Sequence, residues 1–350
     1  MFSVTNNRGF VPQSERFEDR EMVGEDIKAY KIIHKNDFAY NPARINVGSI
    51  AKYNGDEPCM ISSLYVCFTA DKRLDNEWLM QLLKTPKMNF YYNINGEGGV
   101  RVYLFYPNFA RIKTSFPSLQ EQQKISSFLA LLDERIATQS KIIEKLESLI
   151  RGLITDVNSG RIAQCKSVYL RDLLTEQHEK NTNNYEVCSV SVSQGVINQI
   201  DYLGRSFAAK EVLHYNVVNC GDIVYTKSPT GEFPYGIVKR SDITKPVAVS
   251  PLYGVYRPIN DYVGKYLHLY FKSPINAKNY LHKLIQKGAK NTINITNQHF
   301  LDNKILIPEK GWLENIVNFA AAIEMKIATE NKVLQTLQQQ KDYLLSKMFI

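Results

Sequence analysis

The chain carries one long helical pattern twice. The stretch DERIATQSKIIEKL at residues 133–146 recurs as EMKIATENKVLQTL at residues 324–337, so the two copies lie 191 positions apart. At this offset, ten of 38 aligned positions between residues 117–154 and 308–345 are identical. Two copies are too few for a solenoid. The sequence therefore predicts a tandem duplication, in which each unit is a globular segment followed by a long helix.

Shorter similarities precede both helices. Close to the N-terminus the offset is about 185, so the first unit lacks the counterpart of roughly the first twenty residues of the second, which starts at Ser167. Either the chain is shortened there or the missing strand comes from elsewhere. The upstream pairs are LKTP at 83–86 with FKSP at 271–274, ISSLY at 61–65 with VSPLY at 249–253, and NDFAY at 36–40 with GDIVY at 221–225.

The repeated segment has the spacing of a coiled-coil seam. Apolar residues recur three and four positions apart, and a polar residue, Gln139 or Glu330, stands at the same step of each copy. We expect the two helices, each roughly 55 Å long, to pair as an antiparallel coiled coil. Ser118 and Glu121 have the spacing of a capping box. The predicted seam comprises Ile125, Phe128, Leu132, Ile136, Gln139, Ile143, Leu146, Ile316, Phe319, Ile323, Ile327, Glu330, Leu334 and Leu337.

The globular segments have the pattern of α+β domains. Runs rich in Val, Ile and Tyr, such as CMISSLYVCF and GDIVYTK, are separated by turn residues. The helical stretches NEWLMQLLK and KYLHLYFK each end before a proline. We predict a first domain at 1–116 that is incomplete at its N-terminus, a first long helix at 117–157, a second domain at 166–307 and a second long helix at 308–350.

The charge of the chain suits a polyanionic partner. The net charge is +8, and residues 161–307 alone carry +7. Six lysines and no acid lie between Asp261 and Asp302, although a solvated basic face is the alternative interpretation. No window approaches the ~18 apolar residues of a membrane span, and the five cysteines are scattered singly. We therefore expect no membrane association and a cytoplasmic protein with reduced thiols.

These residues resemble a known family. The stretches PSLQEQQKISSFLALLDERIATQSKIIEKLESLIRGL and PEKGWLENIVNFAAAIEMKIATENKVLQTLQQQKDYLL, the hairpin with Asp-x-x-Tyr, the Ser-x-Leu-Tyr strand and KGAKNTINITNQHFLDNKILIP are similar to specificity subunits of type I restriction-modification systems. Gly311-Trp312 departs from the usual Gln-rich turn. The resemblance implies two target recognition domains, each for one half of a split double-stranded DNA site.

The same resemblance implies the partners and the division of labour. The paired helices would separate the two recognition domains and dock methyltransferase subunits, two in number, and restriction/translocase subunits would join through the complex. This chain would be non-catalytic and hold no cofactor. S-adenosylmethionine, ATP and Mg are expected on the partner subunits.

A search for catalytic motifs agrees with a binding role. The stretch FAYNPAR differs from the Asn-Pro-Pro-Tyr motif of adenine methyltransferases, because Ala43 and Arg44 replace the second proline and the aromatic residue. The stretch NGEGGV does not join a strand to a helix, as a dinucleotide site requires. The six histidines lack metal-ligand spacing. The sequence therefore predicts neither catalytic residues nor a metal site.

The candidate DNA contacts lie in loops. Base edges are read by Arg, Lys, Asn and Gln, and phosphates are held by Lys, Arg and backbone amides. The loops QKGAKNTIN, YTKSPTGEFPYG and YLGRSF offer such groups, and a solvated surface charge is the alternative for each residue. The candidates are Arg8, Arg44, Arg101, Arg205, Lys227, Thr230, Lys287, Lys290 and Asn291.

Two other functions remain open at this level. One is a coiled-coil scaffold that only holds protein partners. The other is a silent or recombining specificity cassette without independent DNA recognition. Sequence-selective retention on DNA separates both from a working specificity subunit.

Overall fold

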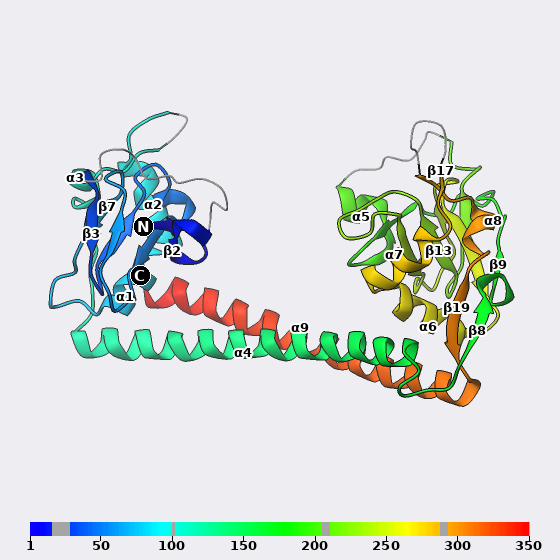
Figure 1. The fold of residues 1–350 in the computed structure, drawn as a ribbon. Helices are drawn as coiled ribbons and strands as arrows, with labels where there is room; N and C mark the ends of the chain where they lie inside the picture. Colours follow the sequence, from blue (N-terminus) through cyan, green and yellow to red (C-terminus); the bar gives the residue numbers. More distant parts are fainter. Residues whose placement is uncertain (16–28, 100–101, 205–210, 288–292, 350) are drawn as a thin grey trace. The chain divides into compact units, whose positions relative to one another are not determined.

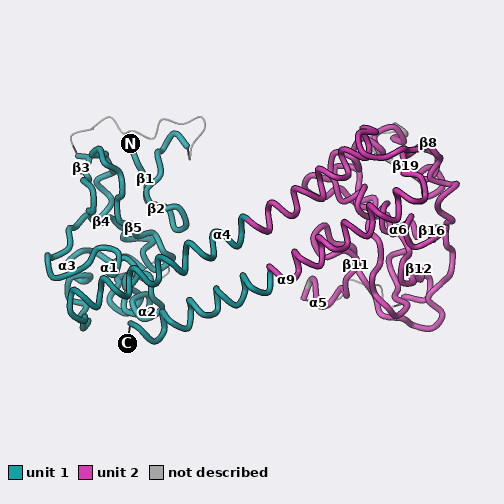
Figure 2. The backbone as a smooth tube through the Cα atoms, turned by 90° about the horizontal axis from the view of Figure 1, so that it is seen from below, with its two compact units in different colours: residues 1–141, 331–350 teal, residues 142–330 magenta. Residues whose placement is uncertain are grey.

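The computed structural model describes residues 1–15, 29–99, 102–204, 211–287 and 293–349. It divides into two compact units (Figure 2), unit 1 with Met1–Lys141 and Asn331–Ile350 and unit 2 with Ile142–Glu330. The boundary falls inside both long helices. Each unit therefore contains one globular segment and one half of each helix.

The two long helices are α4 (Leu119–Asn158) and α9 (Lys310–Met348) (Figure 1). In unit 1, the start of α4 packs against the end of α9, and Asp133 forms an ion pair with Lys341. In unit 2, the end of α4 packs against the start of α9 through an apolar core that includes Ile150 and Ile316. The helix halves therefore run antiparallel within each unit, and the predicted coiled coil is confirmed.

The buried seam differs from the prediction at one step of each helix. Phe128 and Phe319 were expected in the seam, but they are 49% and 50% exposed. The following residues, Leu129 and Ala320, are fully buried instead. When two neighbouring residues are both apolar, either one satisfies the spacing of three and four. The globular segment also packs on this turn of the helix, and it buries the second residue of each pair. The other predicted seam residues are all buried or half-buried.

The start of α4 is capped as the sequence predicts. The backbone N–H of Ser118 donates to Glu121 Oε2 at 3.0 Å, and the N–H of Glu121 lies 3.4 Å from Ser118 Oγ. These reciprocal bonds satisfy N–H groups that have no partner within the helix. Hydrogen bonds from Ser118 hold the pKa of the Glu121 carboxyl below its usual range.

Unit 1 places two small sheets beside three short helices. One sheet has the order β2-β1-β6-β3 and the other has the order β5-β4-β7. The strands are β1 (Phe2–Thr5), β2 (Gly9–Pro12), β3 (Lys31–Ile33), β4 (Phe38–Tyr40), β5 (Ile50–Lys52), β6 (Cys59–Ile61) and β7 (Val66–Phe68). The helices are α1 (Asn76–Leu83), α2 (Pro86–Asn95) and α3 (Tyr106–Phe109), with 3-10 turns at Gln13–Glu15 and Ile45–Val47.

Unit 2 is built around a four-stranded sheet of order β14-β13-β16-β9 and several two-stranded pairs. Its strands are β8 (Cys165–Tyr169), β9 (Leu174–Glu176), β10 (Cys188–Ser191), β11 (Gly195–Asn198), β12 (Asn216–Val218), β13 (Ile223–Thr226), β14 (Ile237–Arg240), β15 (Val247–Val249), β16 (Gly254–Pro258), β17 (Gln286–Lys287), β18 (Ile293–Asn294) and β19 (Lys304–Pro308). The short helices are α5 (Gln199–Leu203), α6 (Asp261–Phe271), α7 (Pro274–His282) and α8 (Asn297–Phe300), with a 3-10 turn at Leu170–Asp172.

The two globular segments share their strand pairings. The hairpin β1–β2, in which Thr5 lies opposite Gly9, corresponds to β10–β11, in which Ser191 lies opposite Gly195. The antiparallel pair β3–β6 corresponds to β12–β15, and β4 lies between β5 and β7 as β13 lies between β14 and β16. The repeat seen in the helices therefore extends through the globular segments.

An aromatic cluster recurs in both cores. In unit 1, Phe109 packs on Tyr40 at 5.1 Å and on Phe68 at 5.3 Å between ring centroids. In unit 2, Phe300 stacks on the corresponding rings of Tyr225 at 4.7 Å and Tyr256 at 4.9 Å. Contacts of this kind add about 0.5–1.5 kcal/mol each beyond area burial. They attach α3 and α8 to the central strand of each sheet.

Candidate nucleic-acid interface

Equivalent hairpins carry several of the predicted DNA contacts. In unit 1, Arg44 lies in the loop between β4 and β5. In unit 2, Lys227 and Thr230 lie in the loop between the corresponding strands β13 and β14. All three residues are exposed. The fold thus presents charged and polar side chains at the same position of each repeat.

Arg8 and Arg44 line one cavity of unit 1. Its volume is about 520 Å³, and it lies where the β1–β2 turn meets the β4–β5 loop. Three asparagines, Asn6, Asn7 and Asn41, line the same cavity. Amide and guanidinium groups gathered in this way are the chemistry of base-edge and phosphate recognition. The structure therefore brings together two arginines that are 36 positions apart in the chain.

The two arginines differ in their partners. Arg8 Nη2 donates to Glu15 Oε2 at 2.9 Å, an exposed ion pair. Arg44 forms no ion pair with any residue that the structure describes. Its loop is ordered by Asn41, whose Oδ1 accepts from the N–H of Ala43 at 3.0 Å, and by the N–H of Ser49, which donates to the Arg44 carbonyl at 3.0 Å. Asn41 thus has a turn-forming role in the stretch FAYNPAR.

The β13–β14 hairpin of unit 2 has a tightly packed base. Gly236 has a φ of +102°, and a Cβ there would lie 1.9 Å from the carbonyl oxygen of Thr226, so only glycine fits. Phe233 is buried below the loop, and its backbone N–H and carbonyl bond to Thr230 at 2.9 and 3.1 Å. Partial burial lowers the pKa of Lys227, and the charge of Glu176 opposes that shift.

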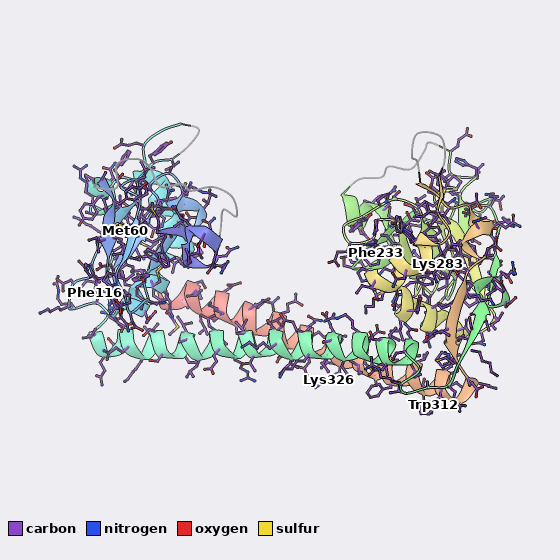
Figure 3. The ribbon with its side chains drawn as sticks, in the orientation of Figure 1. Met60, Phe116, Phe233, Lys283, Trp312 and Lys326 are labelled. Carbon is purple, nitrogen blue, oxygen red and sulfur yellow. The ribbon has the colours of Figure 1, made fainter. Side chains whose placement is uncertain are left out.

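The basic segment of unit 2 is partly neutralised. Lys265 pairs with Asp261 at 2.7 Å, and Lys272 pairs with Glu324 of α9 at 3.0 Å. Lys278 and Lys283 are exposed (Figure 3 labels Lys283), and neither forms an ion pair within the described part of the chain. The available positive surface is therefore smaller than the run of six lysines indicates.

The remaining predicted contacts are only partly placed. Lys287 lies in β17 opposite Ile293. Arg101, Arg205, Lys290 and Asn291 lie outside the described residues.

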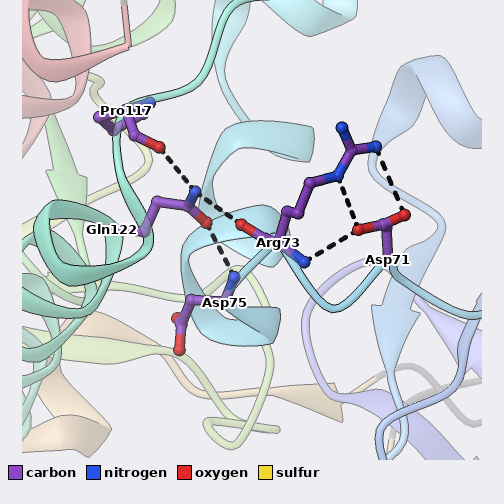
Figure 4. Close-up of polar contacts among 5 residues, drawn as sticks. All are labelled: Asp71, Arg73, Asp75, Pro117 and Gln122. Atoms are coloured by element: carbon purple, nitrogen blue, oxygen red, sulfur yellow. Dashed lines mark hydrogen bonds and ion pairs between the residues drawn. The ribbon is translucent and has the colours of Figure 1, made fainter.

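Sequence reasoning missed the polar groups that share the unit 1 cavity. Asn6 and Asn7 form the turn of the first hairpin, and a polar turn next to Arg8 was the available signal. It also missed Gln122, which is fully buried at the start of α4 and bonds to the loop before α1 (Figure 4). A polar residue at an otherwise apolar helix position was the signal there.

Two kinds of feature were not found among the described residues. Among them, no group of three or more His, Cys, Asp or Glu side chains is arranged to hold a metal ion. No helix in the described ranges is long and apolar enough to cross a membrane.

Comparison with known proteins agrees with the geometry. Residues 23–148 match the family model of the type I restriction modification DNA specificity domain. A search of curated proteins gave no match. One similar solved structure is titled "Structural basis underlying complex assembly and conformational transition of the type I R-M system". Its TM-score is 0.57 at 14% identity, and the match covers 91% of this chain and 83% of that chain.

A second solved structure has the same fold. The type I restriction-modification S subunit from M. genitalium has a TM-score of 0.52 at 13% identity, and the match covers 91% of this chain and 84% of that chain. At these identities the structural likeness shows the fold, and the match to the family model concerns residues 23–148. The chain therefore contains a segment, residues 23–148, that is similar to the type I restriction modification DNA specificity domain, and it shares its fold with the two solved structures.

Proposed function

We propose that the chain recognises a bipartite double-stranded DNA site, with each unit reading one half. The observation that carries this proposal is the repeated hairpin, which presents Arg44 in one unit and Lys227 with Thr230 in the other. Two equivalent hairpins suit two half-sites that are separated by base pairs the protein does not recognise. The chain itself performs no chemistry in this proposal, and S-adenosylmethionine, ATP and Mg belong to partner subunits.

The unit 1 cavity supplies the contacts for one half-site. Arg44 has no competing acid among the described residues, so its guanidinium is available for a guanine edge or a phosphate. Arg8 shares an exposed ion pair with Glu15. Such a pair contributes about 0–1 kcal/mol, so exchange of the carboxylate for a phosphate costs little.

The long helices offer docking positions for methyltransferase subunits. Phe128 of α4 and Phe319 of α9 occupy equivalent positions of the repeat, and both are about half exposed. Phe319 and the exposed Leu149 line a cavity of about 470 Å³ in unit 2. Exposed aromatic residues of this kind mark interaction surfaces. Two equivalent positions suit two methyltransferase subunits, with restriction/translocase subunits joining through them.

The first test is a selection from random duplex DNA at near-physiological salt, with the chain co-purified with its methyltransferase partner. We expect two short motifs with a fixed gap. Arg44→Ala is expected to degrade one motif and Lys227→Ala the other, each by about tenfold or more in affinity. Arg135→Ala removes an exposed charge from α4 and serves as the matched control.

Other outcomes separate the alternatives. Loss of both motifs in the Arg44→Ala variant contradicts the division of labour between the units. No enrichment, with binding that disappears as salt rises, leaves only phosphate contact and favours the scaffold or silent cassette. Phe128→Glu and Phe319→Glu test docking by co-purification of the methyltransferase, with the exposed Ile275→Glu as control.

A further inference from the structure

The two globular segments differ in one place. In unit 2, β8 pairs along the whole length of β19, and β9 pairs with the outer edge of β16. The counterparts of β19 and β16 in unit 1 are residues 113–117 and β7. Within the described part of unit 1, no strand lies beside residues 113–117, and β7 has only β4 as a neighbour. Two strand positions that are filled in unit 2 are therefore open in unit 1.

Side-chain burial shows the consequence. Ile307 of β19 is 8% exposed because β8 covers that strand, whereas Phe116, its equivalent in unit 1, is 43% exposed. Figure 3 shows Phe116 in the segment that leads into α4. Thr114 is likewise exposed, whereas its counterpart Ile305 is buried. Residues 113–117 therefore present their backbone and an apolar side chain without the strand that covers their counterparts in unit 2.

A cavity accompanies the open edge. It has a volume of about 570 Å³ and is lined by Thr114, Phe116 and Pro117 together with Trp78 and Phe349. Trp78 is 2% exposed, and its Nε1–H finds no hydrogen-bond acceptor among the described residues. A buried donor that stays unpaired lowers the stability of the fold.

The equivalent donor in unit 2 is paired. Tyr266, at the position of Trp78, donates its hydroxyl to the carbonyl oxygen of Leu306 at 3.0 Å. Leu306 belongs to β19, which β8 holds in place. The unpaired Trp78 donor and the uncovered strand thus occur together.

We propose that this groove of unit 1 is a strand-addition site for a separate polypeptide segment with the chemistry of residues 164–176. The segment adds an extended strand beside residues 113–117, and its following residues reach the edge of β7 that no strand of the described residues occupies. Main-chain hydrogen bonds supply affinity in this mode of binding, and pockets for alternate side chains supply specificity. An edge strand without a neighbour is a ready template for such pairing.

Unit 2 indicates which side chains the segment needs. Leu170, Leu173 and Leu174 are buried in the unit 2 core, so the segment carries apolar residues at those positions. Tyr169 packs under the amino group of Lys304 at 4.9 Å, and the unit 1 counterpart of that lysine is Lys113. An aromatic residue therefore suits this position as well.

One position differs in charge between the units. Arg171 pairs with Asp302 at 3.0 Å in unit 2, but the unit 1 counterpart of Asp302 is Arg111, which is exposed. Like charges repel and opposite charges attract at such close range. The segment that fits unit 1 therefore has an acidic residue where unit 2 has Arg171.

The test uses the full chain and synthetic peptides with the sequence of residues 164–176, with Ser in place of Cys165. Hydrogen exchange is followed at the amides of Thr114, Ser115 and Phe116. We expect saturating peptide to slow exchange about tenfold or more. A peptide that also carries Arg171→Glu is expected to act at lower concentration than its parent, because it faces Arg111.

Two protein variants make the result specific. Phe116→Asp places a charge in the groove at an exposed position, so the protein is expected to fold and to lose peptide protection. Phe90→Asp changes an exposed aromatic elsewhere in unit 1 and is expected to retain it. Absence of protection in the unchanged protein, or equal protection in the Phe116→Asp variant, overturns the proposal. Protection without peptide that grows with protein concentration also overturns it, because a second copy then fills the groove.

Discussion

The side-chain carbonyl of Gln122 accepts a hydrogen bond from the backbone N–H of Asp75 at 2.8 Å. Its Nε2 donates to the carbonyl oxygens of Pro117 at 2.9 Å and Arg73 at 3.1 Å (Figure 4). One buried side chain thereby fastens the first turn of α4 to the loop before α1. The equivalent residue of the second repeat is Leu313, which is buried in an apolar core. The two repeats therefore anchor the same helix start by different physical means.

Replacement of this anchor is expected to destabilise unit 1. Gln122→Ala leaves the Asp75 N–H and two carbonyl oxygens without their partner in a partly buried site. Unpaired buried groups cost about 1–3 kcal/mol, so the free energy of unfolding is expected to fall by about that amount. Urea denaturation measures the change. Gln123→Ala is the control, since Gln123 is exposed on the same turn, and equal losses in the two variants would refute the role of the anchor.

The long helices show which features of the fold the sequence pattern can predict. The apolar spacing predicted both helices, because each step is local and repeats. The match between the two seams predicted that the helices pair with each other. The same spacing wrongly placed Phe128 in the seam instead of Leu129, because either of two neighbouring apolar residues satisfies it. It also passed over Gln122, because a heptad pattern gives weight to apolar residues. Packing of the globular segment against the first turns decided both positions, and that contact is not local in the sequence.

A charge exchange tests the antiparallel register of unit 1. Asp133 of α4 forms an ion pair with Lys341 of α9, and both side chains are partly exposed. Asp133→Lys alone places like charges together and is expected to cost about 0.2–1 kcal/mol. The double variant Asp133→Lys with Lys341→Asp is expected to regain most of that loss in a double-mutant cycle measured by urea unfolding. Additive effects would mean that the two side chains do not interact in solution.

Two glycines are expected to respond in opposite ways to alanine. Gly236→Ala forces a Cβ against the Thr226 carbonyl at a positive φ, so we expect the free energy of unfolding to fall by about 1–3 kcal/mol. We also expect weaker binding of the half-site that we propose Lys227 to read. Gly152→Ala lies inside α4 with open space around it, so we expect a gain of about 0.5–1 kcal/mol. Thermal unfolding and DNA binding measure both. A neutral Gly236→Ala variant would show that the hairpin adapts.

The candidate interface was predictable in part for a comparable reason. Turn residues between two strand patterns are local, so the sequence pointed to the loops that hold Arg44, Lys227 and Thr230. The cavity shared by Arg8 and Arg44 depends on how one hairpin packs against another sheet. The neutralisation of Lys272 depends on Glu324, which lies on a helix 52 positions later. Such long-range contacts follow from tertiary packing, which no local pattern contains.

Acid is expected to weaken unit 2 through His268. This half-buried residue of α6 accepts a hydrogen bond at Nδ1 from the backbone N–H of Arg240 at 3.2 Å, which requires the neutral ring. Desolvation and the nearby cations Lys239, Lys272 and Arg240 lower its pKa to about 3. A histidine in the unfolded chain has a pKa of about 6.5. Below that value the unfolded state takes up a proton before the folded state does.

Protonation of His268 in the unfolded state therefore lowers the free energy of unfolding in acid. The stability that depends on neutral His268 is complete above pH ~6.5 and is lost progressively as the pH falls from 6.5 towards 3. His268→Gln removes the titrating group, so its free energy of unfolding is expected to be lower at neutral pH but to decline less steeply between pH 6.5 and 4.5. Urea unfolding across that range measures both slopes. His178→Gln, at an exposed site, is expected to keep the slope of the unchanged protein. A His268→Gln slope that equals this control would place the acid sensitivity in other groups.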